Sequence, residues 1–132
     1  TLEDLSKEGV KVILGEAKAN AIGKTAQAIL QKNNLMKVND NVVSTANTVN
    51  EMVVQLTLGS ADAMIATIDS VYNNPKIEII EIDSAQNIDQ IVTGGVISTT
   101  AHPELSKAFM DFASSQEGKA IFARYGFKPV TE

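Results

Sequence analysis

The residues of this chain that could do chemistry are two glycines with a run of mostly small side chains between them. Gly15 ends a short apolar run, and Gly23 opens a segment whose apolar residues recur at helical spacing. A helix that begins after such a loop has backbone N–H groups with no partner inside the helix. Together with the positive end of the helix dipole, these groups bind anions. Residues 10–33 therefore predict a strand, a loop, a helix and an anion site.

The other candidate groups give weaker signals. Gly23-Lys24-Thr25 is similar to the end of a phosphate-binding P-loop, but that loop needs a small residue where Lys18 stands. His102 is the only histidine and the carboxylates are scattered, which argues against a catalytic triad, an acid–base pair or a histidine metal site. The absence of cysteine excludes disulfides and thiolate metal sites. We expect no enzyme activity and no cofactor.

The composition indicates one acidic domain. Of 132 residues, 44% are hydrophobic, which is enough for a core, and 11 basic against 16 acidic residues give a net charge of −5. This charge argues against a nucleic-acid-binding surface. No stretch approaches the roughly 20 apolar residues of a membrane-spanning helix, and none resembles a signal peptide. Because the chain begins at Thr1 instead of Met, we expect a mature or excised part of a longer protein.

The expected elements alternate between strand and helix, as in a parallel α/β sheet with crossover connections. The expected strands are residues 12–14, 42–43, 63–68, 77–82 and 91–98. The expected helices are residues 1–8, a helix opening at Gly23, residues 48–58, a helix opening at Pro103, and residues 114–124. Three of these helices begin at a capping box, namely Thr1 with Asp4, Thr48 with Glu51, and Ser114 with Glu117.

Two of these helices carry an apolar stripe that predicts a buried face. The stripes comprise Ile22, Ala26, Ile29 and Leu30 in the first helix and Met52, Val53 and Leu56 in the second. The last helices are also apolar, with Leu105, Phe109, Phe112, Ile121 and Phe122. So much apolar surface needs a partner, and exchange of this C-terminal arm between two copies predicts a homodimer.

Four stretches in order resemble molybdate-binding proteins of ABC importers, over nearly the whole chain. They are Gly15-Glu16-Ala17 through Gly23, then Thr48-Val49, then Leu58-Gly59-Ser60-Ala61-Asp62-Ala63, and finally Phe109-Met110-Asp111-Phe112 through Ser115, Glu117-Gly118 and Tyr125-Gly126-Phe127. The resemblance implies a type II periplasmic-binding-protein fold, whose two α/β lobes close on a tetrahedral oxyanion. Residues 1–83 would be the parallel-sheet second lobe. Residues 84–132 would be a return crossing strand and C-terminal helices that belong to the first lobe.

The resemblance also implies the ligand-binding residues. One family donor corresponds to the backbone N–H of Ile22 and a second to the backbone N–H of Val49, while a family tyrosine corresponds to the shorter Thr67. Neutral N–H donors at helix N-termini suit a dianion. The implied ligand is molybdate, tungstate or another oxyanion such as sulfate or phosphate, with molybdenum or tungsten present only as the oxyanion. The implied partner is a membrane permease, and the implied location is periplasmic or extracytoplasmic, with the full-length protein anchored to the membrane as a lipoprotein.

Two other classes of protein stay open at the level of the sequence. The same fold serves as the effector-binding domain of transcription regulators, and such a protein would carry a winged helix before Thr1. A small α/β enzyme is the other class, and it would need convergent acid and base side chains. The residues that precede Thr1 would discriminate the regulator from the importer component.

Overall fold

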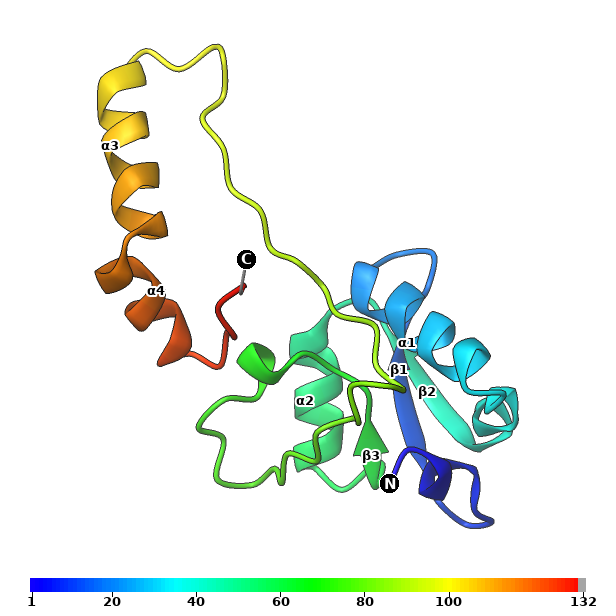
Figure 1. Cartoon of the computed structure of the whole chain (residues 1–132). Helices are drawn as coiled ribbons and strands as arrows, with labels where there is room; N and C mark the ends of the chain where they lie inside the picture. Colours follow the sequence, from blue (N-terminus) through cyan, green and yellow to red (C-terminus); the bar gives the residue numbers. More distant parts are fainter. Residues whose placement is uncertain (131–132) are drawn as a thin grey trace. The chain divides into compact units, whose positions relative to one another are not determined.

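A parallel three-stranded sheet forms the centre of the first part of the chain. The computed structural model describes residues 1–130. The chain divides into two compact units, Thr1–Ile88 and Asp89–Glu132. The sheet lies in the first unit and has the order β2-β1-β3 (Figure 1). Its strands are β1 (Val12–Gly15), β2 (Val42–Ala46) and β3 (Ala63–Met64). Both pairs are parallel, and Gly15 at the end of β1 pairs with Ala46 at the end of β2.

Helices precede and connect these strands. The α-helices of the first unit are α1 (Ala21–Lys32) and α2 (Val49–Thr57), and the second unit contains α3 (Pro103–Ser114) and α4 (Gln116–Ala123). Short 3-10 helices are η1 (Glu3–Ser6), η2 (Met36–Asn41) and η3 (Ile68–Ser70). Among residues 1–130, no helix combines the length and the apolar content that crossing a bilayer requires.

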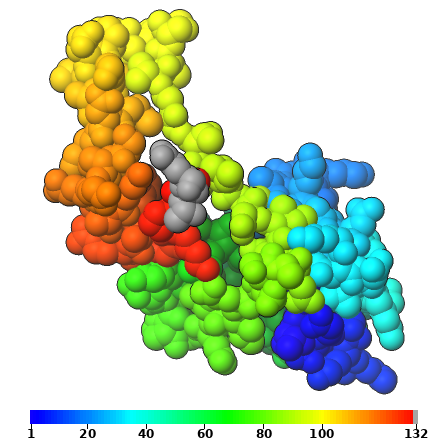
Figure 2. All heavy atoms as spheres, viewed as in Figure 1, coloured from blue at the N-terminus to red at the C-terminus, as the bar shows by residue number. Residues whose placement is uncertain are grey.

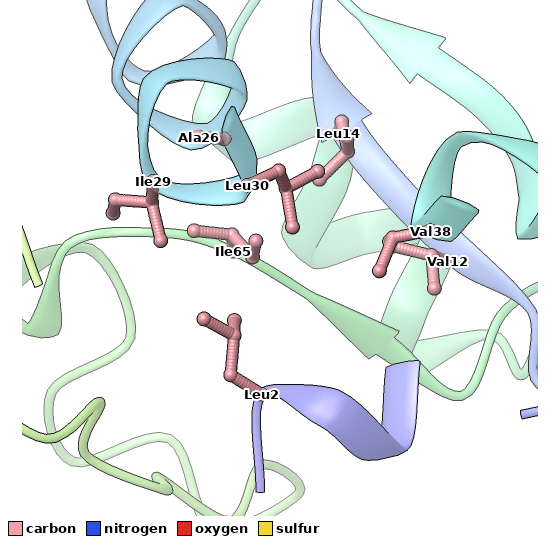
Figure 3. Packing of buried hydrophobic residues seen from close by; sticks show 8 residues of the cluster. All are labelled: Leu2, Val12, Leu14, Ala26, Ile29, Leu30, Val38 and Ile65. Atoms are coloured by element: carbon pink, nitrogen blue, oxygen red, sulfur yellow. The ribbon is translucent and has the colours of Figure 1, made fainter. Parts of the chain in front are cut away.

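The core consists of two clusters on the two faces of β1. Alternate residues of a strand point to opposite faces, so Val12 and Leu14 lie on one side and Ile13 on the other. The first cluster contains Leu2, Val12, Leu14, Ala26, Ile29, Leu30, Val38 and Ile65 (Figure 3). The second cluster contains Ile13, Ile22, Ala46, Met52 and Ala61. The helix α1 therefore covers mainly one face of the sheet and α2 the other, as crossover connections predict.

The predicted apolar stripe is confirmed in α1 and only in part in α2. All four residues of the α1 stripe are buried, and Met52 of α2 is completely buried. Val53 and Leu56 are half-buried. The periodicity of the sequence therefore identified the core face of α1 in full and that of α2 at Met52.

Two predicted strands are wrong for the part of the chain that the structure describes. Residues 77–82 and 91–98 contain no strand, and β3 ends at Met64 instead of residue 68. An extended segment becomes a strand only when a neighbour completes its ladder. Ile79 and Ile80 are exposed, while Ile82 and Ile88 pack against the first cluster.

Side chains hold the segment that follows residue 82 in place of a ladder. The Asn33 side chain donates to the Gln86 carbonyl at 2.9 Å, and Lys32 Nζ donates to the Asn87 carbonyl at 2.8 Å. The Gln86 side chain donates to the Glu3 carboxylate. The beginning of the chain, in dark blue, accordingly lies against residues near 86, in yellow-green (Figure 2).

Several predicted helix starts shift by one or two residues. The first helix is shorter than predicted and has no capping box, since Leu2 is its N-cap and no side chain caps it. The helix expected at Gly23 begins at Ala21. The cap of α4 is Ser115 instead of Ser114. The start of α3 is confirmed, with Pro103 in the first turn and His102 as N-cap.

The second unit has little buried apolar surface of its own. The rings of Phe122 and Phe127 meet edge to face, with centroids 5.7 Å apart. Among the described residues of this unit, only Gly118 is buried. Large exposed apolar side chains include Ile91, Val92, Ile97, Leu105, Phe109 and Tyr125.

Candidate functional site

The N-termini of α1 and α2 begin at the same edge of the sheet. A short loop joins β1 to α1, and Asn47 and Thr48 join β2 to α2. Because β1 and β2 are parallel neighbours whose last residues pair, both loops leave from their carboxyl ends. The Glu16 N–H still donates to the Ala46 carbonyl at 2.8 Å. Open α/β sheets bind ligands at this kind of edge.

Two glycines allow the first turn of α1 to touch the end of β1. A Cβ atom built on Gly23 would lie 2.2 Å from the carbonyl oxygen of Gly15. A Cβ atom on Gly15 would lie 2.8 Å from the backbone nitrogen of Gly23. Real Cβ contacts are never this short, so both positions require glycine in this arrangement. The two glycines that flank this loop thus have a steric reason, which is the close approach of two backbones.

The side chain of Asn20 joins the two loops. Asn20 is the N-cap of α1, and its Oδ1 accepts from the Gly23 N–H at 2.7 Å. Its Nδ2 donates to the carbonyls of Ala46 at 3.1 Å and Asn47 at 2.9 Å. The sequence interpretation missed this residue, although an asparagine just before a helical stripe is a known N-cap signal.

A different pair of side chains caps α2. The Thr48 hydroxyl accepts from the Glu51 N–H at 3.2 Å, which confirms the predicted cap. The Glu51 carboxylate accepts from the Asn47 N–H at 3.0 Å, one residue earlier than in a standard capping box. The beginning of α2 and its loop therefore form one hydrogen-bonded turn.

The cap of each helix leaves its first two N–H groups available. In α1 these belong to Ala21 and Ile22, and in α2 to Val49 and Asn50. No acceptor within the described residues takes a hydrogen bond from any of the four. The side chain of Ile22 belongs to the second core cluster, and Val49 packs against that cluster. The structure thus brings the two predicted backbone donors together at one edge.

The third predicted ligand-binding residue, Thr67, forms a hydrogen bond within its own turn. It follows β3, the other neighbour of β1, and precedes η3. Its hydroxyl and that of Ser70 are 2.6 Å apart, so they form a hydrogen bond within their own turn. No hydrogen bond of the described residues connects Thr67 to the α1 or α2 loop.

The charges near the two helix N-termini are mixed. Lys18 and Lys24 are exposed, and the Glu16 carboxylate accepts from the Lys18 N–H at 3.2 Å. Glu51 adds a second carboxylate. Two positive and two negative side chains leave the neutral N–H groups as the main anion-binding feature of this edge.

The carboxyl groups with shifted pKa values lie elsewhere. A backbone hydrogen bond lowers the pKa of Glu3, and the hydrogen bond from Lys7 lowers the pKa of Asp4. Both residues belong to η1, which precedes β1. In residues 1–130, no three His, Asp or Glu side chains gather into a possible metal site.

A hollow in the second unit offers no comparable chemistry. Its volume is about 520 Å³, and its lining is mainly apolar, including Val96, Ile97, Leu105 and Phe109. The hydroxyls of Thr100 and Ser106 there are 3.2 Å apart. No Lys, Arg, Asp or Glu side chain lines this hollow, and the His102 side chain in its lining is exposed.

The fold and the paired helix N-termini define a periplasmic-binding-protein-like α/β unit, and comparison with known proteins gives the family. Residues 1–128 match the family model described as bacterial extracellular solute-binding protein, and the chain belongs to this family.

Two curated relatives match almost the whole chain. A protein of Haemophilus influenzae named as a binding protein is 26% identical over 128 residues, which are 96% of this chain and 52% of the relative. YvgL of Bacillus subtilis, named as an ABC transporter substrate-binding lipoprotein, is 26% identical over 122 residues, which are 91% of this chain and 46% of the relative. The chain thus spans about half the length of the curated relatives it matches.

Two solved structures share the fold. One is described as the substrate-binding domain of a molybdenum ABC transporter from Clostridium difficile, with a TM-score of 0.80 and 28% identity, over 99% of this chain and 58% of that one. The other is PEB3 with bound L-phospholactate, with a TM-score of 0.74 and 18% identity, over 98% of this chain and 58% of that one. The predicted fold, a parallel-sheet lobe followed by C-terminal helices, is confirmed.

Proposed function

We propose that this chain is part of the substrate-binding component of an ABC importer and captures a tetrahedral oxyanion such as molybdate or tungstate. The backbone N–H groups of Ile22 and Val49 donate to the anion, and the loaded protein passes it to a membrane permease. The observation that carries this proposal is the pair of free helix N-termini at one edge of the sheet. Two helix dipoles there favour the same negative charge.

The chemistry of the donors suits capture and release. Neutral N–H groups hold an oxyanion without a fixed counter-charge, so the anion leaves without breaking a buried ion pair. No convergent acid and base side chains lie at this edge within the described residues, which supports binding without turnover. We therefore propose a transport component and no enzyme.

The comparisons support the ligand and the location in different ways. The Clostridium difficile neighbour is described as part of a molybdenum transporter, which favours molybdate over sulfate or phosphate. The family description names extracellular proteins, and YvgL is named as a lipoprotein, so we propose a location outside the cytoplasmic membrane. The same family match favours the importer component over the effector domain of a transcription regulator.

The length of the relatives supports a two-lobe arrangement. We propose that residues 1–83 form one lobe and that residues 84–132 return to the other lobe, most of which lies outside this chain. The missing lobe would supply further hydroxyl donors beside that of Thr67, which here is hydrogen-bonded to Ser70. Each charged hydrogen bond is worth about 1.5–3 kcal/mol, so the 132-residue chain alone should bind about ten- to a hundredfold more weakly per lost donor.

Calorimetry tests the proposal directly. The full-length protein that contains this chain is titrated with molybdate, tungstate, sulfate and phosphate, and with chloride as a control of equal ionic strength. We expect one molybdate or tungstate ion per protein and weaker binding of the other anions. Tight binding of sulfate or phosphate alone would change the ligand assignment, and no binding of any of the four would contradict the function.

A further inference from the structure

One side chain, that of Asn20, holds the N-terminus of α1 to the loop that begins α2. Its Oδ1 accepts from the Gly23 N–H, and its Nδ2 uses both hydrogens on the carbonyls of Ala46 and Asn47. We propose that Asn20 is a positioning residue of the anion site, which fixes the distance between the two sets of donors. This inference rests on the proposed function.

The two helices need such a link because they cover opposite faces of the sheet. Helix α1 packs mainly on Val12 and Leu14, while α2 packs on Ile13, and Ile22 in the first turn of α1 shares the second cluster with α2. Within residues 1–130, one other hydrogen bond joins the two loops, from Glu16 to Ala46. An anion that takes one N–H from each helix requires a fixed separation between them, since small displacements weaken hydrogen bonds steeply.

The choice of an amide over a carboxylate follows from the same contacts. Aspartate caps a helix about as well as asparagine. An aspartate at position 20 would have no hydrogen to donate to the carbonyls of Ala46 and Asn47, and it would place a negative charge beside the anion. Asn20 is the side chain that caps α1, links the loops and stays neutral.

Asn41 offers a matched control. Its Nδ2 also donates to two backbone carbonyls, those of Leu5 and Lys7, each at 2.7 Å. It precedes β2, so it lies near the amino end of that strand, whereas Asn20 lies at the carboxyl end. Replacement of Asn41 therefore removes an equivalent pair of hydrogen bonds from the opposite edge of the sheet.

Molybdate calorimetry on the full-length protein compares N20S and N20D with N41S and N41D. A serine side chain still caps α1 but is too short to reach the carbonyls of Ala46 and Asn47. We therefore expect N20S to lower molybdate affinity about tenfold. We expect N20D to lower it about a hundredfold, because it adds charge repulsion to the lost link. The Asn41 variants should bind like the parent protein even where their melting temperatures fall as far. Equal affinities for the two pairs of variants would overturn the inference.

A second measurement does not depend on the ligand. Amide hydrogen exchange at Asn47 and Glu51 reports the stability of the turn that begins α2. The Asn47 N–H donates to the Glu51 carboxylate, and the Glu51 N–H donates to the Thr48 hydroxyl. N20S should speed amide exchange at Asn47 and Glu51, even though Asn20 caps the other helix, α1. N41S should leave exchange at both positions unchanged. Unchanged exchange in N20S would overturn the link. If the parent protein fails to bind molybdate but exchange is faster in N20S, the ligand assignment is wrong and the connection of the two loops by Asn20 is supported.

Discussion

At the scale of single residues, the proposed donors are backbone atoms, so proline is the informative replacement. Val49 is the first residue of α2, and Thr48 before it is extended, with φ −130° and ψ 154°, as a residue before proline prefers. We expect V49P to fold and to lose about ten- to a hundredfold in molybdate affinity, the value of one charge-assisted hydrogen bond. V49A should retain the affinity.

Proline at the start of α1 supplies the control for this prediction. Ala21 is exposed and follows the extended Asn20, so A21P fits the first helical position and leaves the Ile22 N–H in place. We expect calorimetry to give A21P the affinity of the parent protein. Equal losses in A21P and V49P would contradict the assignment of Ile22 as the α1 donor. Proline at Ile22 itself is a poorer test, because Ala21 before it is helical and the Ile22 side chain is buried.

The glycine at position 23 gives a prediction in which two effects oppose one another. In a helix, alanine is more favourable than glycine by about 1 kcal/mol. The new Cβ of G23A would lie 2.2 Å from the Gly15 carbonyl oxygen, and such overpacking costs about 1–3 kcal/mol or more. We expect the overlap to dominate, so that urea denaturation shows G23A to be destabilised. G95A, whose Cβ would meet nothing within 4 Å, should change stability by less than about 0.5 kcal/mol.

The residues of the site were only partly predictable from the sequence. Periodicity predicted that Ile22 and Ile29 are buried, because burial follows from helical spacing alone. The role of Asn20 depends on carbonyls at positions 46 and 47, which only the pairing of β1 with β2 brings near. A local pattern carries no information about such distant partners.

At the scale of elements, the start of α4 shows how adjacent serines differ. The Ser115 hydroxyl accepts from the Gly118 N–H at 3.2 Å, whereas the Ser114 hydroxyl donates back to the Asp111 carbonyl. Loss of an N-cap costs about 1 kcal/mol, or about a fivefold change in an equilibrium. We expect S115A to speed amide exchange at Gly118 about fivefold and S114A to leave it unchanged. The reverse order would restore the cap that the sequence predicted at Ser114.

The wrong strands show the limit of apolar patterns for predicting elements. Residues 77–82 and 91–98 have the composition of strands, with isoleucine and valine in short runs. Their neighbours decide the outcome. The sheet has an edge at β2 and another at β3, but among the described residues neither segment pairs with either edge. Under the two-lobe proposal, a ladder for residues 91–98 would require strands outside this chain.

At the scale of the whole molecule, the second unit predicts self-association. Five large side chains of this unit are about 70% exposed, namely Ile91, Val92, Ile97, Leu105 and Phe109. Exposed apolar surface of this extent in one small unit favours association with another protein. A second copy of the same chain is present in any solution of it, so association between copies is the simplest case. We expect light scattering to show a dimer of the 132-residue chain that dissociates on dilution.

A matched pair of variants locates this interface. F109S should shift the equilibrium toward the monomer, because Phe109 is exposed and its replacement removes apolar surface without affecting a core. V54S makes a similar change on the exposed face of α2 in the first unit and should leave the equilibrium unchanged. A monomer at every concentration would mean that the C-terminal arm does not exchange between copies.

The attachment of α1 and α2 to opposite faces of one sheet has a consequence for how ligand binding is felt. Most of the buried residues of α1 belong to the first cluster and Met52 of α2 belongs to the second, yet both helices begin at a single edge. An anion that is hydrogen-bonded to both N-termini connects the two helices. Neither helix can then separate from the sheet before the anion dissociates. At a ligand concentration a hundred times Kd, the added resistance to unfolding is about 2.7 kcal/mol. The clusters on both faces of the sheet should gain this stability, so a small ion would stabilise residues that it does not contact.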